Sequence, residues 1–166
     1  MSSSVRAAGA VTRRRDPRIL LAAAAVVLAA MPLEAAAALR EPASLSWLPI
    51  SVPIGILAIV ALARPFEPAP GEKFSLGATV AFFAAQVLPG ANAVAVIAAA
   101  SLVTRLYMGR SALSTIVNVS SMSAATAAAA LVVSSAALPR IAVVTLSGAA
   151  YWGFTLASIG VMVTAS

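Results

Sequence analysis

The chain contains no cysteine and no histidine among its 166 residues. Without cysteine it can form no disulfide, thiolate metal site or cysteine nucleophile. Without histidine it lacks the commonest metal ligand and the commonest general base. The phosphate-binding and hydrolase patterns GxxxxGK[ST], GxSxG and HExxH are also missing. We therefore expect a protein that is not an enzyme and that holds no metal ion and no cofactor.

Charged residues are scarce as well, at 10% of the chain, whereas 61% of the residues are hydrophobic. Soluble domains are about 45–50% apolar with roughly 25% charge. A mean hydropathy of +1.01 therefore predicts an all-α membrane protein whose main partner is the lipid bilayer. The net charge of +6 does not predict nucleic-acid binding, because the cations lie between apolar runs, where they orient helices in a bilayer.

The apolar runs predict a polytopic bundle of about six transmembrane helices. Residues 74–107 are too long for one ordinary span, and Leu88-Pro89-Gly90 divides them into a hairpin. One kinked helix there, giving five spans in all, is the alternative. The proline-rich segment 64–73 is predicted to be a loop. The expected spans are about 19–39, 46–63, 74–88, 91–107, 112–134 and 141–164.

The basic start of the chain sets the expected domain organisation and orientation. Residues 1–17 are predicted to be a disordered cytoplasmic N-terminus, followed by a transmembrane domain over 18–166. A cleaved secretory signal is the less favoured alternative. With six spans, nine of the eleven cations are cytoplasmic and only Arg40 and Arg140 lie outside. We expect a multi-pass protein of the bacterial inner membrane with its N-terminus in the cytoplasm.

Glu34 is the only carboxylate within a predicted span. Ionised acids are costly in the bilayer centre and are often functional there, so Glu34 is a candidate ligand-binding residue. The favoured interpretation is simpler, however. If Pro32 ends the regular helix, then Glu34 lies near the outer interface, in contact with water.

The fifth predicted span carries Ser114, Asn118 and Ser121 at positions i, i+4 and i+7, which share one helical face. In lipid such groups seek hydrogen-bond partners on neighbouring helices, and this helix–helix role is the favoured interpretation. The functional alternative is a polar wall of a ligand cavity, with Asn118 as the leading contact.

Gln86 and Asn92 flank the Pro89-Gly90 turn. We expect them to cap the arms of the hairpin, and binding of an extracytoplasmic ligand is the alternative. Tyr151 and Trp152 lie midway along the sixth span and are predicted to pack inside the bundle. Three alanine runs and Gly148, Gly153 and Gly160 predict close packing between helices.

Residues 74–133 carry an apolar hairpin with a glycine turn, a basic loop from Arg105 to Arg110, and the pattern Asn118 to Ser123. In these features the segment resembles the N-terminal multi-helix sensor region of bacterial HD-domain phosphohydrolases and diguanylate cyclases. The resemblance implies a membrane sensor that precedes or serves a cytoplasmic output domain. No such catalytic domain follows in the 166 residues, so the activities of those domains are not carried over.

The short helices with alanine and glycine packing are also similar to substrate-binding membrane components of energy-coupling-factor importers. Three hypotheses therefore stand. The first is a sensory, regulatory or anchoring module without its own catalytic domain. The second is a small-molecule-binding importer component, and the third is a structural subunit of a larger membrane complex. Each implies other membrane subunits or a homo-oligomer as partner.

Overall fold

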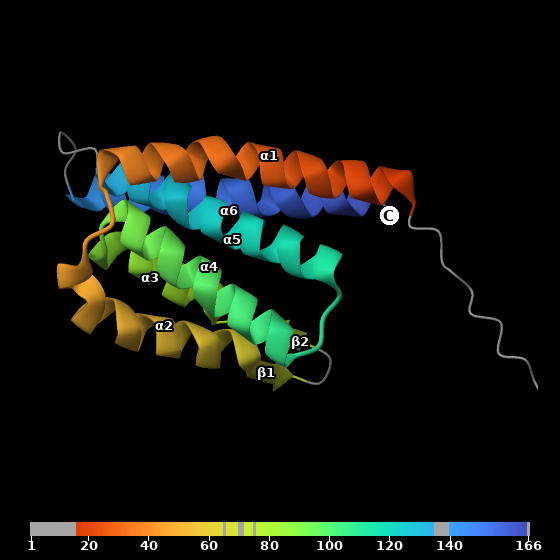
Figure 1. The fold of residues 1–166 in the computed structure, drawn as a ribbon, viewed down its shortest axis with the longest axis horizontal. Helices are drawn as coiled ribbons and strands as arrows, with labels where there is room; N and C mark the ends of the chain where they lie inside the picture. The colour runs from red at the N-terminus through yellow and green to blue at the C-terminus, as the bar shows by residue number, and fades with distance from the viewer. Residues whose placement is uncertain (1–15, 65, 70–71, 75, 135–139, 166) are drawn as a thin grey trace, which may run out of the picture.

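The computed structural model describes residues 16–64, 66–69, 72–74, 76–134 and 140–165. The predicted disordered segment 1–17 lies outside these residues except for its last two positions. The described chain forms a bundle of six α-helices, as predicted (Figure 1). These are α1 (Pro17–Arg40), α2 (Leu48–Ala63), α3 (Gly77–Val87), α4 (Gly90–Tyr107), α5 (Ala112–Val133) and α6 (Arg140–Ala165).

Five helices are long and apolar enough to cross a membrane: α1, α2 with its preceding 3-10 turn η1 (Leu45–Trp47), α4, α5 and α6. Helix α3 has only 11 residues. At 1.5 Å per residue it covers about 16 Å, roughly half of a 30 Å hydrocarbon core. Residues 74–107 thus form two helices, as expected, but the first is shorter than the predicted span 74–88.

The predicted loop 64–73 contains regular structure. Strand β1 (Phe66–Ala69) pairs antiparallel with β2 (Glu72–Phe74), with Phe66 opposite Phe74 and Ala69 opposite Glu72. The ribbon lies beside the end of α2 (Figure 1). Prolines and charges correctly marked the end of the helix, but no alternation of apolar and polar residues was present there to predict strands.

Successive helices run in opposite directions, so their ends gather at the two ends of the bundle (Figure 1). One end carries Arg18 at the start of α1, Arg64 after α2, and Arg105 and Arg110 around the α4–α5 turn. We call it the arginine-rich end. Helix α6 also finishes there, beside the start of α1. Helix α5 lies in the centre and contacts α1, α3, α4 and α6.

Small side chains fill the interior of the bundle, and large apolar side chains cover its outside. The hydrophobic core is mostly alanine, including Ala81, Ala84 and Ala129, each 0% exposed. By contrast, Leu39 is 85% exposed and Leu21 is 71% exposed. Soluble monomers rarely expose contiguous apolar surface on this scale, whereas acyl chains solvate it without cost. The chain is a multi-pass membrane protein.

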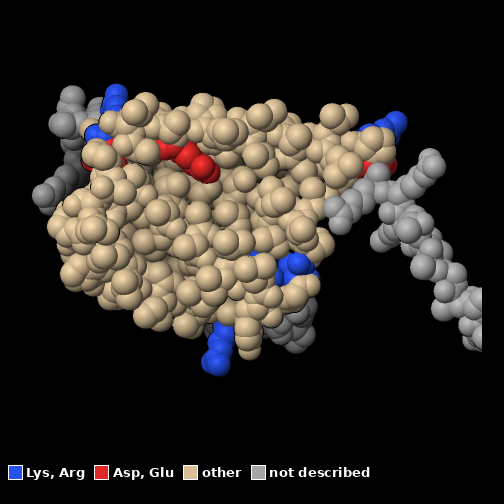
Figure 2. Space-filling view, viewed as in Figure 1, with Lys and Arg blue, Asp and Glu red and all other residues tan. Residues whose placement is uncertain are grey.

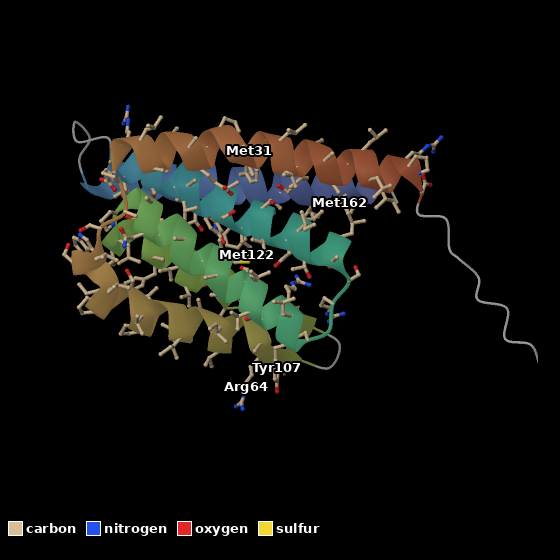
Figure 3. The ribbon with its side chains drawn as sticks, viewed as in Figure 1. Met31, Arg64, Tyr107, Met122 and Met162 are labelled. Carbon is tan, nitrogen blue, oxygen red and sulfur yellow. The ribbon has the colours of Figure 1, made fainter. Side chains whose placement is uncertain are left out.

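The charged and aromatic residues fit the same environment. Basic side chains lie toward the ends and the lower edge of the view in Figure 2, and the broad surface between them is uncharged except for one acidic patch in its upper part. Arg64 and Tyr107 point outward at the edge of the bundle in Figure 3, and Tyr107 is 86% exposed. Half-buried Trp47 lies at the opposite end of α2 from Arg64. Rings at both ends of a span are typical of membrane interfaces.

Helix α6 departs from two predictions. Tyr151 is buried against Phe82, but Trp152 is 49% exposed, so the prediction that both rings pack inside was wrong for Trp152. A side chain added at Gly153 or Gly160 would meet no atom within 4 Å, so these glycines make no close helix contact among the described residues. Adjacent residues on a helix point about 100° apart, and only one of the two rings can face inward.

Candidate ligand-binding site

The polar face of α5 begins at a capped helix end. Ser111 is the N-cap of α5, and its hydroxyl accepts a hydrogen bond from the Ser114 amide at 3.3 Å. The cap fixes the start of the helix and therefore its rotational phase. Ser114, Asn118 and Ser121 then share one face, as their spacing predicted, and all three line the same cavity.

This first cavity, here called the α6 cavity, has a volume of about 490 Å³. It lies at the arginine-rich end, between the first half of α5 and the last turns of α6. Its volume is within the range of about 300–1,000 Å³ that is usual for small-molecule sites. Polar groups come mainly from α5, and apolar ones from α6 and α1. The apolar wall includes Ile159, Met162 and Val163 of α6 and Ile19 of α1.

A second cavity of about 380 Å³, the α4 cavity, adjoins the α6 cavity at Arg105 and Asn118. Both of these residues line both cavities. The Arg105 Nε donates a hydrogen bond to the Asn118 Oδ1 at 3.1 Å, which joins α4 to α5. Ser121 of α5 and Ile159 of α6 also line both cavities, so the two cavities adjoin each other. Met122 lines the α4 cavity and Met162 the α6 cavity, and both are labelled in Figure 3.

Most other hydroxyl groups of α5 are already satisfied. Thr115 and Thr126 donate to backbone carbonyls four residues earlier, at 3.0 and 2.8 Å. This is the usual solution for hydroxyls in apolar helices. Ser114 and Ser121 differ, because their hydroxyls have no hydrogen-bond partner within the part of the chain described. These two groups are free to bind a molecule in the cavity.

Arg105 was not among the predicted site residues, because its charge was interpreted only as a marker of topology. One signal was present in the sequence. Arg105 lies inside the apolar run 74–107, three residues before the turn 108–111 begins. A cation placed inside a span seeks a polar partner on the next helix, and Asn118 is the only side-chain amide of α5.

Glu34 lies elsewhere, on the face where α1 meets α5. Its carboxylate accepts a hydrogen bond from the Ser123 hydroxyl. The expectation that Pro32 ends the regular helix was wrong, because α1 continues through Pro32 to Arg40. Neighbouring helices can supply the contacts that compensate for proline in a membrane helix. Glu34 is half-buried and lines neither the α6 nor the α4 cavity.

Asn92 and Gln86 also lie outside both cavities, and the expectation that they cap the arms of the hairpin was wrong, because both bind residues outside it. Asn92 holds the α1–α2 connection, because its Oδ1 accepts from the Ser44 amide at 2.9 Å and its Nδ2 donates to the Ser44 carbonyl at 3.1 Å. Glu41 caps α4 by accepting from the Gly90 amide at 2.8 Å. Gln86 donates to the buried Ser147 hydroxyl at 2.7 Å, which links α3 to α6. These contacts tie helices together at the end of the bundle opposite the arginine-rich end.

The six predicted residues therefore separate into two groups. Ser114, Asn118 and Ser121 meet at one cavity, whereas Glu34, Gln86 and Asn92 each join a different pair of elements. Among the described residues no three acidic side chains lie close enough together to hold a metal ion.

Comparisons with protein-family models, curated proteins and solved structures found no match. What the site can do therefore follows from its own side chains. It offers a guanidinium, an amide and two free hydroxyls on one wall, opposite an apolar wall. Such a surface can bind and orient a small molecule that has a polar and an apolar part.

Proposed function

We propose that this multi-pass membrane protein is a sensory or regulatory module without a catalytic centre of its own. A small molecule binds in the α6 cavity, and its occupancy is transmitted through the last turns of α6. One observation carries the proposal: a wall of the cavity belongs to the final two turns of that helix, through Ser158, Ile159, Met162 and Val163. A ligand therefore contacts the same segment that would pass the signal on.

The direction of the signal follows from the charges. The arginine-rich end is the cytoplasmic end under the positive-inside rule, in a bacterial inner membrane. The N-terminus of α1 and the C-terminus of α6 then both face the cytoplasm, where an output domain or a partner subunit would lie. This arrangement agrees with the resemblance of residues 74–133 to the sensor regions of HD-domain phosphohydrolases and diguanylate cyclases. The partner would be a separate protein or a second copy of the chain.

The importer hypothesis requires a cavity that opens outward and that includes Glu34, Gln86, Asn92 or Asn118. Of these only Asn118 lines the α6 cavity, which lies at the arginine-rich end. A purely structural subunit needs no ligand-sized cavity. The sensory module is therefore the function that the geometry favours.

Filling the cavity tests this function. We expect Ser121→Phe to remove any small molecule that copurifies with the wild type in mild detergent, as measured by native mass spectrometry. Because Ser121 lines the cavity, a phenyl ring there occupies the ligand space. Ile116→Phe is the matched control, since Ile116 lies on the same helix, 52% exposed, and lines neither cavity.

Hydrogen exchange supplies the signalling part of the test. In the ligand-bound wild type and in Ile116→Phe, backbone amides in the last turns of α6 should exchange more slowly than in the wild type stripped of ligand. If Ser121→Phe retains the molecule at one per chain, the α6 cavity is not the site. If ligand binds but exchange in α6 is unchanged, the protein is a passive binder and not a sensor.

A further inference from the structure

Arg105 and Arg110 have no acidic partner among the side chains that the structure describes. Arg105 lines both cavities and Arg110 lines the α4 cavity, and none of the described residues that line either cavity is acidic. Within the described part of the chain neither guanidinium pairs with a carboxylate. Unpaired charge at the edge of a membrane span is costly, and such residues usually have a charged partner.

The hydrogen-bonding capacity of Arg105 is largely unused. A guanidinium has five N–H donors, and here Nε donates to Asn118. Its four terminal N–H groups find no acceptor among the side chains described. These four donors form the planar fork that binds a carboxylate or a phosphate through two parallel hydrogen bonds.

The α4–α5 turn holds the second cation beside the first. Gly109 has φ = 62°, a left-handed conformation that glycine adopts without steric cost. The chain reverses there, and the Arg110 amide donates to the Arg105 carbonyl at 3.1 Å. Two like charges held together repel each other, and an anion bound between them relieves this repulsion.

We infer that the ligand carries an anionic group, a carboxylate or a phosphate. This group binds Arg105, which lines both cavities, and Arg110, which lines the adjoining α4 cavity, and an apolar part of the ligand lies in the α6 cavity against α6. This inference depends on the proposed function and narrows its ligand class. Asn118 holds Arg105 in place, the Ser121 hydroxyl adds a hydrogen bond, and Ile159 and Met162 contact the apolar part. The anion comes from a soluble organic acid or from the headgroup of an anionic lipid.

The absence of native cysteine makes a direct test possible. In Ser121→Cys, reconstituted in phosphatidylcholine nanodiscs, the rates of modification by an anionic and a cationic methanethiosulfonate reagent are compared. Ser46→Cys, exposed at the opposite end, gives the intrinsic ratio of the two rates. We expect the ratio of the anionic to the cationic modification rate to be at least about tenfold higher in Ser121→Cys than in Ser46→Cys. A tenfold ratio corresponds to about 1.4 kcal/mol.

Substitutions of the arginines show which of them causes the preference for the anionic reagent. Arg105→Gln in the Ser121→Cys protein should reduce the anionic preference to near the Ser46→Cys value, and Arg110→Gln should reduce it in part. Arg64→Gln is the matched control, because Arg64 is exposed at the same end and lines neither cavity. A preference that survives Arg105→Gln, or that falls equally in Arg64→Gln, overturns the assignment. Ser114→Cys should repeat the result and serves as a second reporter if Ser121→Cys does not fold.

The failures of the two proposals are distinguishable. If the two reagents modify Ser121→Cys in the same ratio as they modify Ser46→Cys, the cavity is accessible but the anion inference is wrong. If neither reagent modifies Ser121→Cys or Ser114→Cys, there is no accessible cavity and both proposals fail.

Two further arms separate the ligand sources. Inorganic phosphate is added in one arm, and phosphatidylglycerol is included in the nanodiscs in the other, each with the Ser121→Cys protein. Protection of the introduced thiol by phosphate indicates a soluble anion, and protection by the lipid indicates a headgroup. Protection by neither contradicts the inference.

Discussion

Ala129→Leu is expected to lower the free energy of unfolding of the bundle by about 3 kcal/mol. Ala129 is 0% exposed and lies on α5, the central helix. Helices in lipid gain little from hydrophobic burial and depend on close contact between small residues. A leucine there adds three carbon atoms where no space exists, so neighbouring helices must move apart.

The control for Ala129→Leu is the same substitution at Ala25 on α1, which is exposed. Its side chain would meet acyl chains, and we expect a change within about 0.5 kcal/mol. Both variants can be unfolded from mixed micelles by titration with denaturing detergent, with tryptophan fluorescence as the signal. Equal stability of the two variants would show that the alanine interior is not closely packed.

Gly90→Val is expected to cost about 2–3 kcal/mol, because α4 begins against the end of α1 with no room for a side chain. A Cβ atom at Gly90 would lie 3.1 Å from the Ala37 carbonyl oxygen and 3.4 Å from the Ala37 Cβ. Valine adds two further methyl groups at this contact. The displacement would also weaken the hydrogen bond from the Gly90 amide to Glu41.

Gly160→Val provides the comparison, because a Cβ at Gly160 meets nothing within 4 Å. Gly90 is the first residue of α4 and Gly160 lies inside α6, so the greater helix propensity of valine favours only Gly160→Val, by about 0.5 kcal/mol. We expect Gly160→Val to unfold at nearly the wild-type detergent concentration in the same titration. If Gly90→Val is equally stable, the close contact between α1 and α4 does not contribute to stability.

The helices could be predicted from the sequence because lipid imposes a simple rule: long apolar runs must be helical. The division at Pro89-Gly90 followed from the backbone chemistry of these two residues. The length of α3 was overestimated, because apolar composition alone does not show where a helix begins. Residues 72–74 form a strand, and α3 begins at Gly77. The expectation that Pro32 ends the first helix failed, because the effect of a proline depends on neighbouring helices whose positions the sequence does not give.

The site was predictable only where it is local. The spacing of Ser114, Asn118 and Ser121 places them on one face whatever surrounds α5, and the structure adds a cavity in front of that face. The bond between Ser123 and Glu34 joins residues 89 positions apart, and no local pattern encodes that pairing. The role of Arg105 required knowledge of how α4 and α5 pack, because the same residue type also marks topology.

Labelling from one side of the membrane tests most directly whether the helices cross a bilayer with the arginine-rich end in the cytoplasm. The single-cysteine variants Ser46→Cys, in η1, and Met108→Cys, in the α4–α5 turn, place thiols at opposite ends of the bundle. Intact bacterial cells are treated with a membrane-impermeant maleimide before or after permeabilisation. We expect Ser46→Cys to react in intact cells and Met108→Cys to react only after permeabilisation. Reaction of both variants in intact cells, or recovery of the protein in the soluble fraction, would contradict this arrangement.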